Sequence, residues 1–129
     1  MMATYSHDYD SAYDPAMPVV EIQVRRAADQ PAITLTAIVD TGSDATMIPL
    51  GYLRQLRARK GHRQMLSGTA GGRYAVDLYH VSVQIGEHRP IYVHAAGTVQ
   101  GDEVILGQDV LNQFVMMLNA PAHVVEINE

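Results

Sequence analysis

The residues best able to do chemistry form one short segment, Asp40-Thr41-Gly42-Ser43, which follows the apolar run 37–39. β-Branched residues precede it and Gly42 permits a sharp turn, so Asp40 is expected where a strand ends. A tight loop at this point places one carboxylate where backbone N–H groups and hydroxyls can fix its orientation. Such a carboxylate can act as a general acid or base. The competing interpretation of these letters alone is a polar turn that ends a strand.

Two further segments accompany this loop. The apolar residues 104–106 run into Gly107, ahead of a short helical pattern that Asp109 can begin. A glycine-rich stretch, 67–72, lies between two alternating segments and predicts a hairpin turn. It is no phosphate loop, because a Walker motif requires Lys after its last Gly. The letters alone do not separate an exposed hairpin from one that covers a cleft.

The elements that must position these segments are mostly strands. Period-two alternation and β-branched residues predict strands over about 19–25, 33–40, 62–66, 74–85, 91–95 and 103–106, with a terminal hairpin of 115–119 and 123–127. The alternation changes phase near Tyr79, as a β-bulge requires. Helical patterns are short, at about 50–60 and 109–114. The sequence therefore predicts a mostly β fold with one or two short helices.

The polar, non-periodic residues 1–17 are predicted to be a flexible N-terminal arm, which Pro15 and Pro18 separate from a domain over 18–129. This arm lacks the positive region and the apolar core of a secretory signal, so we expect cytoplasmic residence. No apolar stretch approaches the ~20 residues of a membrane helix, and no membrane partner is expected.

Composition excludes several classes of site. The 129 residues are 47% hydrophobic with a formal net charge of −5, which fits one globular core. No Cys is present, which excludes disulfides and thiolate chemistry, and the six His form no HExxH, so no metal site is expected. A basic run includes Arg54, Arg57, Arg59, Lys60 and Arg63, but no aromatic residues accompany it, and a solvated face is favoured over nucleic-acid binding.

The loop and the second apolar-Gly segment together resemble the retropepsin-like aspartic proteases, over about Val19 to Ile127 and closest to their bacterial and ubiquitin-receptor-associated branches. The resemblance implies a closed β-barrel and no metal or organic cofactor. It assigns catalysis to Asp40, loop support to Thr41, Gly42 and Ser43, the second signature to Ile105, Leu106 and Gly107, and a substrate-covering flap to Gly68, Thr69, Ala70, Gly71, Gly72 and Tyr74.

Two departures from the retroviral members stand out. Gln108 occupies the position where they usually carry an Arg that braces an acidic residue near the catalytic loop, so Asp44 lacks that partner. About 20 residues with a predicted hairpin follow Asp109, in place of a single terminal strand. From the residues themselves, the Ser43 hydroxyl is expected to donate a hydrogen bond to ionised Asp40, which predicts a lower pH optimum than in a Ser43→Ala variant.

The resemblance implies an aspartic endopeptidase that acts on peptides or proteins. Its mechanism needs two carboxylates that share one proton, yet the sequence contains one Asp-Thr-Gly. We therefore expect a homodimer in which each subunit supplies one Asp40. The resemblance also implies that Thr41 forms a hydrogen bond across the dimer interface. Two alternatives remain open: a catalytically weak or inactive dimer that binds extended peptides by strand addition, and a purely structural dimerisation domain.

Overall fold

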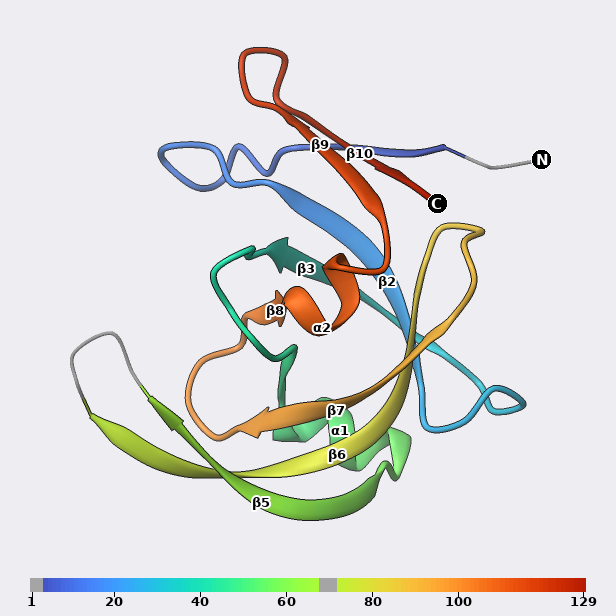
Figure 1. Ribbon diagram of the computed structural model, residues 1–129, viewed down its shortest axis with the longest axis vertical. Coiled ribbons are helices and arrows are strands. Elements are labelled where there is room, and N and C mark those ends of the chain that lie inside the picture. The colour runs from blue at the N-terminus through green and yellow to red at the C-terminus, as the bar shows by residue number, and fades with distance from the viewer. Residues whose placement is uncertain (1–3, 68–71) are drawn as a thin grey trace.

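The computed structural model describes residues 4–67 and 72–129 and consists mainly of strands (Figure 1). The strands are β1 (Tyr5–Asp8), β2 (Val19–Arg25), β3 (Ile33–Val39), β4 (Met47–Pro49), β5 (Arg59–Ser67), β6 (Arg73–Ile85), β7 (Ile91–Thr98), β8 (Val104–Leu106), β9 (Val115–Asn119) and β10 (Val124–Asn128). The two helices are α1 (Leu50–Leu56) and α2 (Gln108–Leu111). The predicted mostly β fold with short helices is confirmed. No helix in the described ranges is long and apolar enough to cross a bilayer.

Six strands close on themselves as a barrel. Hydrogen-bonded neighbours follow the order β2, β3, β8, β4, β7 and β6, and β6 pairs back to β2. β5 pairs with β6 and extends the sheet outward from the barrel. The closed barrel that the resemblance implied is confirmed.

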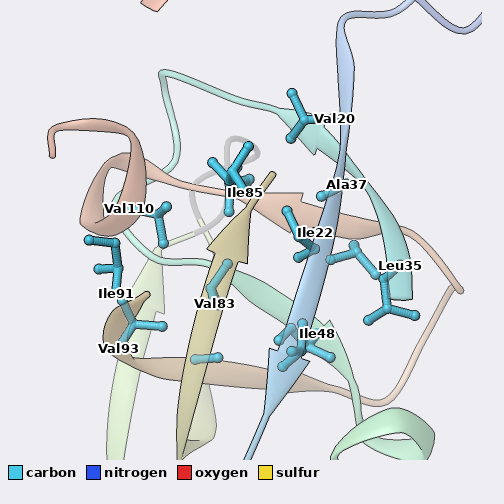
Figure 2. Close-up of a cluster of buried hydrophobic side chains, with 14 of the residues drawn as sticks. Val20, Ile22, Leu35, Ala37, Ile48, Val83, Ile85, Ile91, Val93 and Val110 are labelled. Atoms are coloured by element: carbon cyan, nitrogen blue, oxygen red, sulfur yellow. The ribbon is translucent and has the colours of Figure 1, made fainter. Parts of the chain in front are cut away.

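The barrel interior is filled by the apolar face of each strand (Figure 2). On β2, Val20, Ile22 and Val24 are fully buried while the residues between them are not, which is the alternation seen in the sequence. Neighbouring strands contribute Leu35, Ala37, Ile48, Val83, Ile85, Ile91 and Val93, and α2 contributes Val110. Burial of each larger side chain of this kind stabilises the fold by about 1.5–3 kcal/mol.

The phase change predicted near Tyr79 is present, and a bulge lies opposite it. Val76 and Leu78 of β6 pack in a small second cluster, whereas the strand's later apolar residues enter the main core. The β5–β6 register shifts between Lys60 and Arg63, so the extra residue lies on β5 rather than on β6. β6 itself continues in unbroken register with β7 through this region, so it reaches the two apolar clusters by burying opposite faces in its two halves.

A second, three-stranded sheet in the order β1, β10, β9 joins the two ends of the chain, at the end of the molecule opposite β5 (Figure 1). Its β9–β10 hairpin confirms the predicted terminal hairpin. The residues 1–17, in contrast, were expected to form a flexible arm, and Tyr5–Asp8 is instead a strand paired with β10. The Tyr5 ring packs against the core, and its hydroxyl accepts a hydrogen bond from the Glu21 N–H at 2.9 Å. These partners are distant in sequence, so the local pattern of residues 1–17 does not reveal the strand.

Candidate active site

The two sequence signatures meet because β3 and β8 are parallel neighbours. Ile38 pairs with Ile105, and Val39 pairs with Leu106. At the end of β3 the Asp40 N–H donates to the Leu106 carbonyl at 3.1 Å, which extends the ladder by one bond. The strand therefore places Asp40 next to the point where Gly107 follows β8.

Asp40 is half-buried and its carboxylate is held by its own loop. The Gly42 N–H donates to Asp40 Oδ1 at 3.0 Å, and the Ser43 N–H donates to the Asp40 carbonyl at 3.2 Å. A Cβ added at Gly42 would lie 3.4 Å from Oδ1, an ordinary van der Waals contact, so the space beside the acid does not by itself require glycine. The first bond orients the carboxylate through Oδ1, and the second closes the backbone turn that carries it.

The Ser43 side chain points to a different partner from the one expected. Its hydroxyl donates to the Ala45 carbonyl at 2.8 Å, rather than to the Asp40 carboxylate. The hydroxyl closes the turn over residues 43–45, a local side-chain bond that serine often makes in turns. The expected effect of Ser43 on the pH optimum thus loses its structural basis, while its support of the loop stands on this bond.

Gly107 is required by close packing. A Cβ at this position would lie 2.7 Å from the carbonyl carbon and oxygen of Ala45 and 2.8 Å from the Ser43 oxygen. All three are backbone atoms, which cannot turn aside as a flexible side chain would. The glycine therefore lets the second signature rest directly on the catalytic loop.

Two side chains that directly follow the second signature, Gln108 and Asp109, fasten the loop to α2. Asp109 accepts hydrogen bonds from the Thr46 hydroxyl at 2.7 Å and the Thr46 N–H at 2.9 Å, and the same hydroxyl accepts from the Gly107 N–H at 3.2 Å. Gln108 donates through Nε2 to the Thr41 carbonyl at 2.6 Å, and its backbone N–H donates to the Ser43 carbonyl at 2.8 Å. We had interpreted Asp109 as a helix start. The signal for its second role is Thr46, a hydroxyl residue inside an apolar run.

Gln108 and Asp44 bear on the first departure from the retroviral pattern. Gln108 braces the catalytic loop through main-chain oxygens, where an Arg would reach for a carboxylate. Asp44 is exposed and forms no ion pair with any residue of 4–67 or 72–129. Thr41 is also exposed, so its side chain is free to meet another molecule.

A groove of about 510 Å³ opens in front of Asp40. Its walls come from the catalytic loop and from the strands β5 and β6, with the side chains of Met47, Met65, Leu66 and Tyr74 as its apolar part. Tyr74 is 44% exposed and stands opposite Leu66 in the β5–β6 ladder. Of the expected flap, Gly68, Thr69, Ala70 and Gly71 lie outside the described residues, and Gly72 is exposed just before β6. The expected flap strands thus border the same groove as Asp40.

Charge at the base of these strands is paired. Asp77 on β6 contacts Arg63 and Lys60 on β5, each at 3.2 Å. Hydrogen bonds from Arg63 first, and then from Lys60, hold the Asp77 pKa below its ordinary value of 3.8. Elsewhere, the part of the chain that the structure describes contains no group of His and carboxylate side chains arranged to hold a metal ion.

Comparison with known proteins places this site in a family. The profile of the family described as "gag-polyprotein putative aspartyl protease" matches residues 30–113, which include both signatures. The chain belongs to this aspartyl protease family. No curated protein matches its sequence.

Solved structures agree with this assignment at the level of the fold. A retropepsin-like aspartic protease from Rickettsia conorii is similar with a TM-score of 0.67 and 12% identity, over 99% of this chain and 92% of that one. EIAV protease, in complex with the inhibitor HBY-793, is similar with a TM-score of 0.56 and 19% identity, over 75% of this chain and 86% of that one. The fold is therefore that of the retropepsins.

Proposed function

We propose that this aspartyl protease family member is an active endopeptidase, and that it works as a homodimer with one Asp40 from each subunit. The observation that carries the proposal is the position of Asp40. Its carboxylate is held by the Gly42 N–H at the end of a strand and faces a groove bordered by the flap strands. The groove has a volume of about 510 Å³ and a partly apolar lining, which suits a peptide.

The proposed reaction uses two carboxylates that share one proton. The ionised Asp40 takes a proton from a water molecule, which attacks the carbonyl carbon of the peptide bond. The protonated Asp40 of the second subunit gives its proton to the carbonyl oxygen. The tetrahedral intermediate then breaks down with cleavage of the C–N bond. One Asp40 gives its proton to the leaving amine, and the other takes a hydroxyl proton from the intermediate as the product carboxyl group forms, which restores the shared proton. This chain supplies one such carboxylate in a family loop, so a single copy holds half of the machinery.

The test compares wild type with Asp40→Asn on a diverse peptide mixture from about pH 4 to 7, with cleavage sites mapped by mass spectrometry. Asp29→Asn is a matched control, because it removes the same charge from an exposed turn between β2 and β3. We expect cleavage by wild type and Asp29→Asn, and none by Asp40→Asn. Equal cleavage by all three proteins would contradict the mechanism.

The same experiment separates the enzyme from a binding module. A protein that binds peptides of the mixture but cuts none, with Asp40 intact, would instead be a peptide-binding dimer.

Cytoplasmic residence, which the sequence suggests, also stays a prediction, and cell fractionation would test it.

A further inference from the structure

Asp44 is an acid of the groove that no cation of the described chain neutralises. Its side chain is exposed, and it lines the same groove of about 510 Å³ as Asp40. None of the ion pairs formed within residues 4–67 and 72–129 includes it. Its carboxylate is therefore available to a molecule that enters the groove.

The groove as a whole is acidic. Asp40 and Asp44 are the charged residues among those that line it in the described chain, and its other polar side chains, such as Gln64 and Ser67, are neutral. The residues 68–71 between the two flap strands are Gly, Thr, Ala and Gly, which add no ionisable side chain. A hollow lined by charge of one sign, with partly apolar walls, raises the local concentration of the opposite charge. This groove therefore favours cations.

The neighbouring hollow shows the contrasting case. It has a volume of about 610 Å³ and meets the groove at Tyr74, which lines both. Its acid is Asp77, and Lys60 and Arg63 each contact that carboxylate at 3.2 Å. A cation from outside would have to compete with these two partners for Asp77. The uncompensated carboxylate beside the groove is therefore that of Asp44.

We propose that Asp44 selects a Lys or Arg side chain of the substrate, so that the enzyme prefers peptides with a basic residue near the bond it cuts. Asp44 follows Asp40 by four positions, a length of chain that spans at most about 14 Å. An extended peptide advances about 3.3 Å per residue, so the basic residue lies within about four positions of the cut. The inference rests on the proposed endopeptidase and names its substrate class.

The two-fold axis of the proposed homodimer extends this preference. Each subunit supplies one Asp44, and the axis places the two carboxylates at equal distances on opposite sides of the paired Asp40 residues. A bound peptide therefore meets one Asp44 before the cut and another after it. The preferred substrates carry basic residues on both sides of the bond.

The test uses Asp40→Asn, in which Asp44 remains as the acid of the groove and binding is measured without cleavage. The immobilised protein is incubated with a randomised pool of synthetic peptides at about pH 6 and low salt, and retained peptides are identified by mass spectrometry. The same background then receives Asp44→Asn, Asp44→Glu or Asp29→Asn. Asp29→Asn is the matched control, because it removes the same formal charge from an exposed turn outside the groove.

We expect Lys and Arg to be enriched about two- to fivefold among retained peptides, the range that one exposed ion pair supplies. The enrichment should persist in Asp44→Glu and Asp29→Asn, disappear in Asp44→Asn, and shrink when salt is raised to about 0.5 M. An Asp40→Asn protein that retains no basic peptides preferentially, or an enrichment that survives Asp44→Asn, would overturn the inference.

Cleavage of the same pool by wild type separates this inference from the proposed function. We expect the cut sites to carry Lys or Arg within about four positions on each side. Cleavage with no basic preference would overturn the role of Asp44 and leave the endopeptidase standing. Basic peptides that are retained through Asp44 but never cut by wild type would overturn the enzyme and leave the selection of cations standing.

Discussion

The contact between Asp109 and Thr46 joins α2 to the segment that follows the Asp40 loop. Thr46 is fully buried, and both its hydroxyl and its N–H donate to the Asp109 carboxylate. We expect Asp109→Ala to lower the free energy of unfolding by about 1–3 kcal/mol, because the buried Thr46 groups lose their acceptor. Urea denaturation measures this, with Glu87→Ala in an exposed turn as the charge control. A loss no larger than that of the control would contradict this role.

Ser43 gives a second prediction at this scale. Because its hydroxyl closes the turn onto the Ala45 carbonyl, we expect Ser43→Ala to lower the free energy of unfolding by about 0.5–1.5 kcal/mol. Thermal and urea unfolding would show the change. A variant as stable as wild type would mean that the hydroxyl bond contributes nothing to the loop.

Residue types predict part of the site and leave part of it hidden. The location of Asp40 at a strand end can be predicted from the local sequence, because the β-branched strand residues and the turn glycine lie directly beside it. The Asp109–Thr46 bond joins positions 63 residues apart, so no local pattern announces it. The sequence offers the Ser43 hydroxyl two kinds of acceptor, the nearby Asp40 carboxylate or a backbone carbonyl, and does not decide between them; in the structure it donates to the Ala45 carbonyl.

At the scale of elements, the contact of α2 with the catalytic loop depends on Gly107. We expect Gly107→Ala to destabilise the fold by about 1–3 kcal/mol and to reduce cleavage, because the added methyl group meets backbone atoms at 2.7 Å. Gly51→Ala in α1 is the control. Its added Cβ meets nothing within 4 Å and it should stabilise the helix by about 0.5–1 kcal/mol. Equal effects of the two substitutions on stability would refute the close-packing argument.

The β5–β6 pair carries a pH dependence. Arg63 and Lys60 lower the pKa of Asp77 in the folded state, so their contribution to stability is present above the ordinary value of 3.8. It is lost as the pH falls through the lowered pKa of the folded state. We expect wild type to be slightly more stable than Asp77→Asn at neutral pH, with a difference that vanishes in acid. Urea unfolding of both proteins across pH measures it, and a difference that stays constant into acid would disprove the coupling.

Some elements are readable from the sequence and others are not. The barrel strands are, because each buries one face and alternates. β1 is not, since it has four residues of mixed polarity and gains its order from β10, a strand at the other end of the chain. The α1 helix was expected to reach residue 60 but ends at Leu56, because Arg57 adopts a left-handed backbone conformation and β5 begins at Arg59.

At the scale of the whole molecule, the chain is a closed barrel with one Asp-Thr-Gly loop, which we propose to be catalytic. The sequence predicted the mostly β fold, and the resemblance implied the barrel. The pairing of β3 with β8, which brings the two signatures together, joins distant segments and follows from the fold as a whole. Under the proposed mechanism, two copies of Asp40, on two chains, act as one site.

Subunit mixing tests this claim most directly. Wild type and Asp40→Asn are mixed in varied ratios at constant total concentration, allowed to exchange subunits, and assayed for peptide cleavage. If the site needs both carboxylates, activity follows the square of the wild-type fraction, so an equal mixture retains about one quarter of the activity. Activity that falls only in proportion to the wild-type fraction, to about one half in the equal mixture, would show that one chain suffices and would contradict the account.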